Sequence, residues 1–255
     1  MTEPRVTTRD EWLVERKQLL EREQDLNQLS EELTKQRLAL PWVPVEKEYR
    51  FATEEGEQTL AELFDGRSQL LVYHMIFGPE WTAACPACTN IVDELNLALV
   101  HLNGNDVSLA IVAHAPLEKV RAYRERMGWD VPCVSSFDSD FNYDFGVSFT
   151  EEQRRGGAVY NFEPADFDKV VEQMSKSELV RKAAKSCGIT LEEYVTTEGP
   201  GLSAFVLDGG AVYHTYSVYA PDAMLMLTWS NLLERTPSGE GGLTEILRRD
   251  EYESG

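Results

Sequence analysis

Apolar residues recur at seven-residue steps through the first forty positions of the chain, with charged and amide side chains between them. A stripe kept at this spacing predicts the seam of one long amphipathic helix. Thr7 or Thr8 can cap the helix, Pro41 and Pro44 end it, and residues 1–44 therefore form a separate N-terminal unit. The seam suits a partner helix in a homodimer, or a helix folded back on its own domain. It consists of Trp12, Leu19, Leu26, Leu33 and Leu40.

After position 45 the pattern changes to short apolar runs separated by turn residues. Residues 69–77 predict a buried strand and 85–102 a helix, because the apolar positions switch from a continuous run to helical spacing. Residues 107–114 predict a second strand and 117–128 a second helix. A two-stranded hairpin is expected over 204–216, where two glycines form the turn.

Strand, helix, strand, helix and hairpin is the element order of a thioredoxin-type domain. A right-handed crossover makes the two central strands parallel, so the sequence predicts an α/β fold with a central mixed sheet flanked by helices. We expect this domain over 45–236, with a helical, charged insertion at about 151–200 and a last helix at about 222–234. Residues 237–255 are acidic and contain Gly and Ser, and we expect them to form a flexible tail.

Charge restricts the classes of partner. The chain has 24 basic and 44 acidic residues and a formal net charge of −20, which argues against nucleic acid and against anionic membranes. No apolar run approaches the length of a membrane span. The first residues have neither a basic start nor an apolar core, so we find no secretory signal and expect a soluble cytoplasmic protein. Four cysteines in 255 residues are too few for a disulfide scaffold.

Two of these cysteines, Cys85 and Cys88, are three positions apart at the start of the predicted helix. Unpaired backbone N–H groups and the helix dipole stabilise a thiolate there, so we expect the pKa of Cys85 to lie below that of free cysteine, about 8.5. Cys88 is one turn further on and can attack a mixed disulfide at Cys85. Pro86 fits the first turn because its missing N–H would be unpaired anyway. The pair predicts thiol–disulfide exchange with Cys85 attacking and Cys88 resolving, without a bound cofactor.

Other interpretations of the pair remain open. A zinc site needs two further ligands, and Cys133 and Cys187 stand alone in the sequence. Cys133, next to Pro132, is expected to be a small buried residue rather than a resolving thiol, and Cys187 has no predicted role. Two thiolates with His214 would suit copper. Two inert buried cysteines, or a binding protein that keeps the fold without redox chemistry, are further possibilities.

The segment WTAACPAC (81–88) is similar to the active-site segment of thioredoxin-like reductases, in which Trp precedes Cys-Pro-x-Cys. In this resemblance Trp81, Thr82 and Pro86 support the two cysteines. Thr82 also resembles the threonine that precedes the peroxidatic cysteine of peroxiredoxins. Residues 131–149 resemble the extended segment of these proteins, and residues 201–215 resemble the hairpin that follows it. A peroxidase, or a specialised small-molecule enzyme on the same scaffold, is thus an alternative. Peroxiredoxins place an arginine against the thiolate, and the sequence places none there.

The chain as a whole resembles a family of bacterial proteins of unknown function (domain of unknown function number 899). The resemblance implies a thioredoxin-like fold and brings no established reaction. It is carried by LPWVPVEKEYRF, LVYHMIFGPEW with CPAC, APLEKVRAYRERMGW, SSFDSDFNYDF and VYHTYSVYA.

Two polar-aromatic clusters are candidates for a substrate pocket. Asn142 and Tyr143 belong to the first, and His214 and Tyr216 to the second, on the predicted hairpin. On this fold both clusters could face the helix that carries Cys85, with His214 as a base or ion-pair partner. The alternative is that these aromatic residues only pack. The expected partner of the site is a small-molecule or protein thiol or disulfide.

Overall fold

The computed structural model describes residues 5–220, 228–237 and 246–252. The chain divides into two compact units, Met1–Pro41 and Trp42–Gly255. The predicted last helix falls partly outside the described residues, and its described part is α9 (Thr228–Leu233).

The N-terminal unit contains one long helix, α1 (Arg9–Leu38). Its first turn carries a capping box, in which the side chain of Thr8 accepts a hydrogen bond from the Glu11 N–H and the Glu11 carboxylate accepts one from the Thr8 N–H. A helix cannot continue through Pro41. The predicted cap and end of the helix are therefore confirmed. Val43 and Pro44, which the sequence analysis assigned to the N-terminal unit, instead form a strand in the larger unit.

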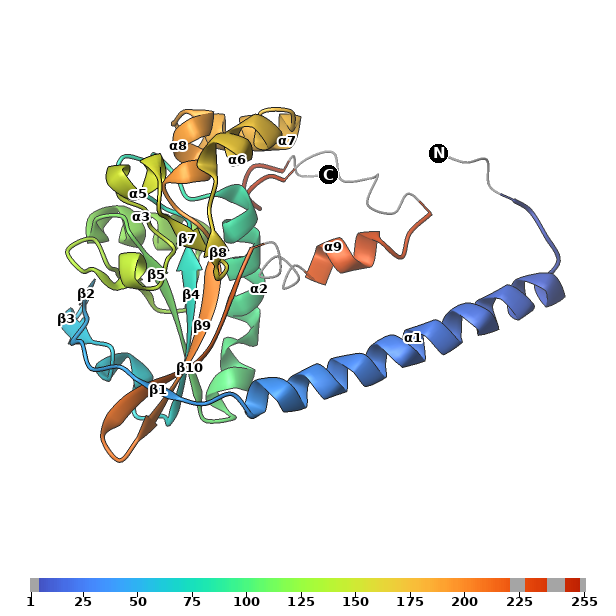
Figure 1. Ribbon diagram of the computed structural model, residues 1–255, viewed down its shortest axis with the longest axis horizontal. Coiled ribbons are helices and arrows are strands. Elements are labelled where there is room, and N and C mark those ends of the chain that lie inside the picture. Colours follow the sequence, from blue (N-terminus) through green and yellow to red (C-terminus); the bar gives the residue numbers. More distant parts are fainter. Residues whose placement is uncertain (1–4, 221–227, 238–245, 253–255) are drawn as a thin grey trace. The chain divides into compact units, whose positions relative to one another are not determined.

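Eight strands among the described residues of the larger unit form one mixed sheet, in the order β1-β10-β9-β4-β5-β6-β2-β3 (Figure 1). β4 runs parallel to β5, which runs parallel to β6, while β9 and β10 form the antiparallel hairpin beside β4. The neighbouring strands β10, β9, β4 and β5 have the arrangement of a thioredoxin-like fold, as the element order predicts. The strands are β1 (Val43–Pro44), β2 (Arg50–Thr53), β3 (Gly56–Thr59), β4 (Gln69–Met75), β5 (Val107–Ala113), β6 (Cys133–Ser135), β9 (Gly201–Asp208) and β10 (Ala211–Tyr219).

Residues 151–200 are mostly helical, as predicted, and also contain a small hairpin of β7 (Val159–Tyr160) and β8 (Glu163–Pro164). Figure 1 shows α6, α7 and α8 gathered at the end of the sheet where α2 begins. No helix within the described ranges is long and apolar enough to cross a membrane. The remaining helices are the 3-10 helix η1 (Glu62–Phe64), α2 (Pro86–Asn103), α3 (Leu117–Met127), α4 (Phe141–Asp144), α5 (Glu151–Arg155), α6 (Phe167–Met174), α7 (Glu178–Ser186) and α8 (Leu191–Thr196).

Side chains of β4 alternate between two cores, because successive residues of a strand point to opposite faces of the sheet. Tyr73 and Met75 pack in the core that contains Cys85 and Cys88. Val72 belongs to the other core. The sheet therefore separates the two sulfurs from any side chain that packs on the second face.

The described part of the predicted tail, residues 246–252, is packed rather than frayed. Arg248 is only 1% exposed, and its guanidinium donates to the backbone carbonyl of Ala84. A buried guanidinium requires hydrogen-bond acceptors, and these hold the segment in place.

Candidate functional site

The site is built where β4 leads into α2. Cys85 is the N-cap of α2 and Pro86 its first residue, which agrees with the sequence prediction. The N–H of Cys85 donates to the Ile76 carbonyl at 3.0 Å, and the Cys85 carbonyl accepts from the Thr89 N–H at 2.9 Å. The sulfur of Cys85 thus lies beside the free N–H groups of the first helical turn, where negative charge is favoured.

A tyrosine from the insertion covers this sulfur. The Tyr194 hydroxyl lies 2.9 Å from Cys85 Sγ, and its ring stacks on that of Trp81, with centroids 5.5 Å apart and an interplanar angle of 27°. Trp81 is buried and supports the tyrosine. When Cys85 is a thiolate, the hydroxyl donates a charge-assisted hydrogen bond to it.

The surroundings shift the pKa values of Cys85 and Cys88 in opposite directions. A hydrogen bond from Cys88 is the largest factor that lowers the pKa of Cys85, and the Tyr194 hydroxyl and the N–H groups of Ala87 and Cys88 add to it. Burial opposes them, and the resulting pKa is about 6. Burial and the neighbouring Cys85 raise the pKa of Cys88 well above the ordinary value. At neutral pH Cys85 is the thiolate and Cys88 the protonated thiol.

Beneath the pair lies Tyr73, which is fully buried. Its hydroxyl has no hydrogen-bond partner within the described part of the chain. Burial raises its pKa far above the ordinary value, and the charge of Cys88 raises it further, so the phenol stays protonated. If Cys88 lost its proton, the negative charge of its thiolate would lie beside this phenol.

A buried arginine network backs the loop before Cys85. Arg248 Nη2 donates to the Ala84 carbonyl at 2.6 Å, and Nε donates to the Tyr123 hydroxyl at 2.9 Å. The Tyr123 hydroxyl also lies 2.7 Å from Thr89 Oγ1, in the first turns of α2. The guanidinium thus fixes both the loop and the start of the helix.

Thr82 contacts the insertion rather than Cys85. Its N–H and its hydroxyl donate to the Cys187 carbonyl at 2.9 and 3.0 Å. This contact brings a third cysteine beside the site, for which no role was predicted.

The site is closed to solvent. Cys85 and Cys88 are 2% and 1% exposed. A reactant can reach Cys85 only after residues around it, Tyr194 among them, have moved.

Three of the four predicted substrate-binding residues, Asn142, Tyr143 and His214, make their contacts away from Cys85. The fourth, Tyr216, follows a register shift that turns its side chain to the face of the sheet opposite to that of His214. His214 packs against Phe145 and Phe205, in the core on the other face of the sheet, and its Nε2 lies 2.8 Å from Ser217 Oγ. Tyr216 is on the same strand, and its carbonyl lies 3.0 Å from the same His214 nitrogen. The sheet keeps His214 from joining the two sulfurs.

The first polar-aromatic cluster is also separate from Cys85. Asn142 is buried, and its side-chain oxygen accepts from Ser136. Tyr143 is partly buried and packs edge-on against His114, with ring centroids 5.1 Å apart. His114 Nδ1 lies 2.9 Å from a carboxylate oxygen of the buried Glu198. This pair ties the end of β5 to the segment that enters β9.

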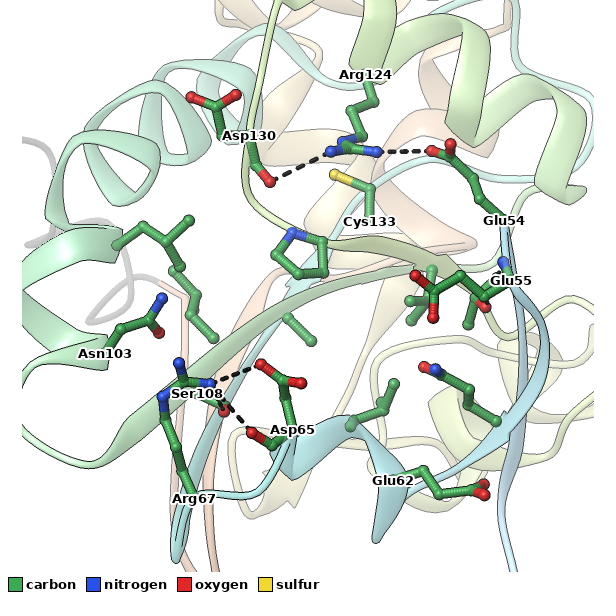
Figure 2. A pocket seen from close by; sticks show the side chains of 18 residues that line it. Glu54, Glu55, Glu62, Asp65, Arg67, Asn103, Ser108, Arg124, Asp130 and Cys133 are labelled. Atoms are coloured by element: carbon green, nitrogen blue, oxygen red, sulfur yellow. Dashed lines mark hydrogen bonds and ion pairs between the residues drawn. The ribbon is translucent and has the colours of Figure 1, made fainter.

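Cys133 lies in a different hollow, with a volume of about 410 Å³ (Figure 2). Burial raises its pKa to about 12. Figure 2 shows that Arg124 bridges the Glu54 carboxylate and the Asp130 carbonyl, so the guanidinium nearest the thiol is already occupied by acceptors. Cys133 is accordingly a buried, protonated thiol.

Within residues 5–220, 228–237 and 246–252, no group of three or more His, Cys, Asp or Glu side chains is arranged to hold a metal ion.

Three residues of the site escaped the sequence: Tyr194, Cys187 and Arg248. Each lies in a segment predicted as insertion or tail, more than 100 positions from its contact in the Cys85 loop. None of the three carries a sequence signal that points to a site: Arg248 adjoins Arg249, Tyr194 follows two glutamates, and Cys187 has no partner cysteine nearby in the sequence.

Comparison with known proteins supplies the family. No curated protein matches the chain. Among solved structures, it is similar to peroxiredoxin Q of Xanthomonas campestris, with 13% identity, a TM-score of 0.42, and 72% of this chain and 90% of that chain covered. It is also similar to peroxidoxin BcpB of Mycobacterium tuberculosis, with 12% identity, a TM-score of 0.42, and 74% and 96% covered.

The profile of a family described as bacterial protein of unknown function (DUF899) matches residues 1–252. Nearly the whole chain is matched, including the N-terminal helix, the segment around Cys85 and Cys88, and the insertion. The chain therefore belongs to this bacterial family.

Proposed function

We propose that this protein is a thiol–disulfide oxidoreductase in which Cys85 attacks and Cys88 resolves. The observation that carries the proposal is the contact between Tyr194 and Cys85 at the start of α2, together with the low pKa of that thiol. An inert buried cysteine has a raised pKa, as Cys133 does. A thiolate stabilised near neutral pH is the form that attacks disulfides.

The exchange would proceed in two steps. The Cys85 thiolate attacks one sulfur of a substrate disulfide, RS–SR, so that a Cys85–SR bond forms and RS⁻ departs. Cys88 then loses its proton and attacks Cys85, so that a Cys85–Cys88 disulfide forms and the second RSH is released. The substrate gains two electrons, Cys88 supplies the proton of one product, solvent protonates the departed RS⁻, and the protein becomes oxidised.

Regeneration needs a second thiol, either a low-molecular-weight thiol or a protein reductase. No bound cofactor enters the exchange, since the electrons move between sulfur atoms. We propose the cytoplasm as the compartment, because a dithiol that reduces substrate disulfides has to be kept reduced, and the cytoplasm is a reducing environment.

Substrate access would depend on α8. Because Tyr194 covers a sulfur that is 2% exposed, α8 has to shift before a disulfide reaches Cys85. Short helices at the protein surface open locally at low free-energy cost, which makes this movement accessible.

The proposal is tested with oxidised glutathione as substrate. The reduced protein is incubated with it, and non-reducing peptide mass spectrometry identifies the linkage. We expect a Cys85–Cys88 disulfide with release of two equivalents of reduced glutathione. Cys85→Ser should abolish the reaction, and Cys133→Ser should leave it unchanged. Recovery of Cys85 as a free thiol after prolonged incubation of the wild-type protein would contradict the proposal.

A further inference from the structure

A third thiol, Cys187, is held beside the Cys85 loop. It ends α7, is fully buried, and its sulfur lies 3.6 Å from the carbonyl oxygen of Ala84, the residue before Cys85. Its own carbonyl accepts the two hydrogen bonds from Thr82 described above. The turn after α7 and the loop before α2 are therefore fastened to each other at two points.

The next residue, Gly188, shows how closely the two segments fit. Its φ is +75°, and a Cβ atom there would stand 2.6 Å from Thr82 Oγ1. Only glycine combines this backbone conformation with this approach. The placement of Cys187 is thus built into the backbone of both segments.

Arg248 joins Cys187 to the site. Its Nη2 lies 2.6 Å from the Ala84 carbonyl and 3.5 Å from Cys187 Sγ. One buried guanidinium therefore contacts both the loop that carries Cys85 and the third sulfur. A cation at this position lowers the cost of placing negative charge on Cys187.

The charges of the two sulfurs are linked. Burial raises the pKa of Cys187 to about 12, and the nearby Cys85 also raises it, while Arg248 acts in the opposite direction. The group is a protonated thiol while Cys85 is a thiolate. Once Cys85 is bonded to a substrate sulfur, its charge is gone and the guanidinium favours ionisation of Cys187.

We propose that Cys187 is a second resolving thiol for Cys85. This inference rests on the proposed function. After Cys85 has formed a mixed disulfide, Cys85–SR, the sulfur of Cys187 attacks Cys85. The Cys85–SR bond breaks, a Cys85–Cys187 bond forms, and the proton of Cys187 leaves with the departing group as RSH. The resulting disulfide would tie the insertion, with its cover residue Tyr194, to the start of α2.

Cys187 therefore competes with Cys88 for the same intermediate. Cys88 has the backbone position of a CxxC partner and faces the phenol of Tyr73, whereas Cys187 has a guanidinium beside it. The two resolving routes release the same product but leave different covalent links. The Cys85–Cys88 disulfide stays at the start of α2, whereas the Cys85–Cys187 disulfide joins residues 102 positions apart in the sequence.

The full-length Cys88→Ser variant separates the routes. The reduced variant is incubated with oxidised glutathione, and its disulfides are mapped by non-reducing peptide mass spectrometry. We expect an intramolecular Cys85–Cys187 disulfide. The Cys88→Ser, Cys187→Ser double variant should stop at the Cys85–glutathione mixed disulfide, whereas adding Cys133→Ser to Cys88→Ser should leave the Cys85–Cys187 link intact. The same maps on Cys88→Ala show whether the serine itself matters.

The outcomes distinguish this inference from the proposed function. If Cys88→Ser and Cys88→Ala both stop at a stable Cys85–glutathione adduct with free Cys187, the role of Cys187 is overturned and the attacking role of Cys85 remains. Absence of glutathione on Cys85 in the double variant overturns both proposals. Arg248→Gln in the Cys88→Ser background tests whether the guanidinium assists Cys187. The pH profile of the resolving step should move to higher pH. At a given pH below the pKa of Cys187, the step should become tenfold slower for each unit by which that pKa rises.

Discussion

The hydroxyl group of Tyr194 lies 2.9 Å from the sulfur of Cys85, although the two residues are 109 positions apart in the sequence. This contact gives the insertion a role at the thiol. It supplies a donor to the thiolate and a cover over it, and the stacked ring of Trp81 fixes the orientation of that donor.

The pKa of Cys85 predicts the pH dependence of its reactivity. With a pKa of about 6, the thiolate fraction rises from pH 5 to pH 7 and changes little above it. The rate of alkylation by iodoacetamide, followed at Cys85 by mass spectrometry, should show a midpoint near pH 6. Cys133, with a pKa of about 12, should remain unmodified below pH 9 in the folded protein. A midpoint near 8.5 for Cys85 would contradict the structure.

The same shift predicts a pH-dependent stability. The pKa of Cys85 is lower in the folded protein than in the unfolded chain, where a thiol has a pKa of about 8.5. Ionisation therefore stabilises the fold. This contribution is complete above about pH 8.5 and is lost as the pH falls through about 6. Under reducing conditions, the difference in unfolding free energy between wild type and Cys85→Ser should shrink between pH 8.5 and pH 5.5, and an equal difference at both pH values would count against a buried thiolate.

Substitution of Tyr194 separates its two effects. Tyr194→Phe keeps the stacked ring and removes a hydrogen bond to a charged group, worth about 1.5–3 kcal/mol. The pKa of Cys85 should rise by about one to two units, which alkylation profiles would detect. Tyr194→Ala removes the cover as well, so alkylation at pH 9, where both variants are ionised, should be faster than in Tyr194→Phe. Equal rates in the two variants at pH 9 would show that the ring does not limit access.

Arg248 and Arg249 form a matched pair for stability. Arg248→Ala leaves the buried Ala84 carbonyl and Tyr123 hydroxyl without their donor, at a cost of about 1–3 kcal/mol for each unpaired group. Arg249 is half exposed, and its ion pair with Asp93 spans 3.5 Å, so Arg249→Ala should change stability by less than about 0.5 kcal/mol. Urea unfolding of both variants measures the difference, and similar midpoints would contradict the buried network.

We propose that α1 pairs with the same helix of a second copy. A single helix cannot bury its own apolar seam, and a matching helix of a second copy presents a complementary one. Sedimentation should show a dimer for the intact chain and a monomer for a chain that begins at Trp42. Leu19→Glu with Leu26→Glu, placed on the seam of the intact chain, should also give a monomer. An intact chain that sediments as a monomer at tens of micromolar would rule out the pairing.

Local pattern in the sequence determined the elements. The Thr8 cap and Pro41 marked the ends of α1, the continuous apolar run predicted β4, and a proline one residue after Cys85 placed that sulfur at the start of α2. These features act over one or two turns of chain, so neighbouring residues carry the information. The order of the elements was then enough to predict the thioredoxin-like sheet.

The tertiary structure alone decided what surrounds the thiols. Tyr194, Cys187 and Arg248 reach the site from segments without a distinctive pattern, because one polar residue among charged neighbours leaves no periodic trace. The expectation that His214 faces Cys85 also depended on which side of the sheet its side chain lies. Hairpin register and strand alternation place it in the opposite core, and this follows from long-range pairing rather than from local sequence.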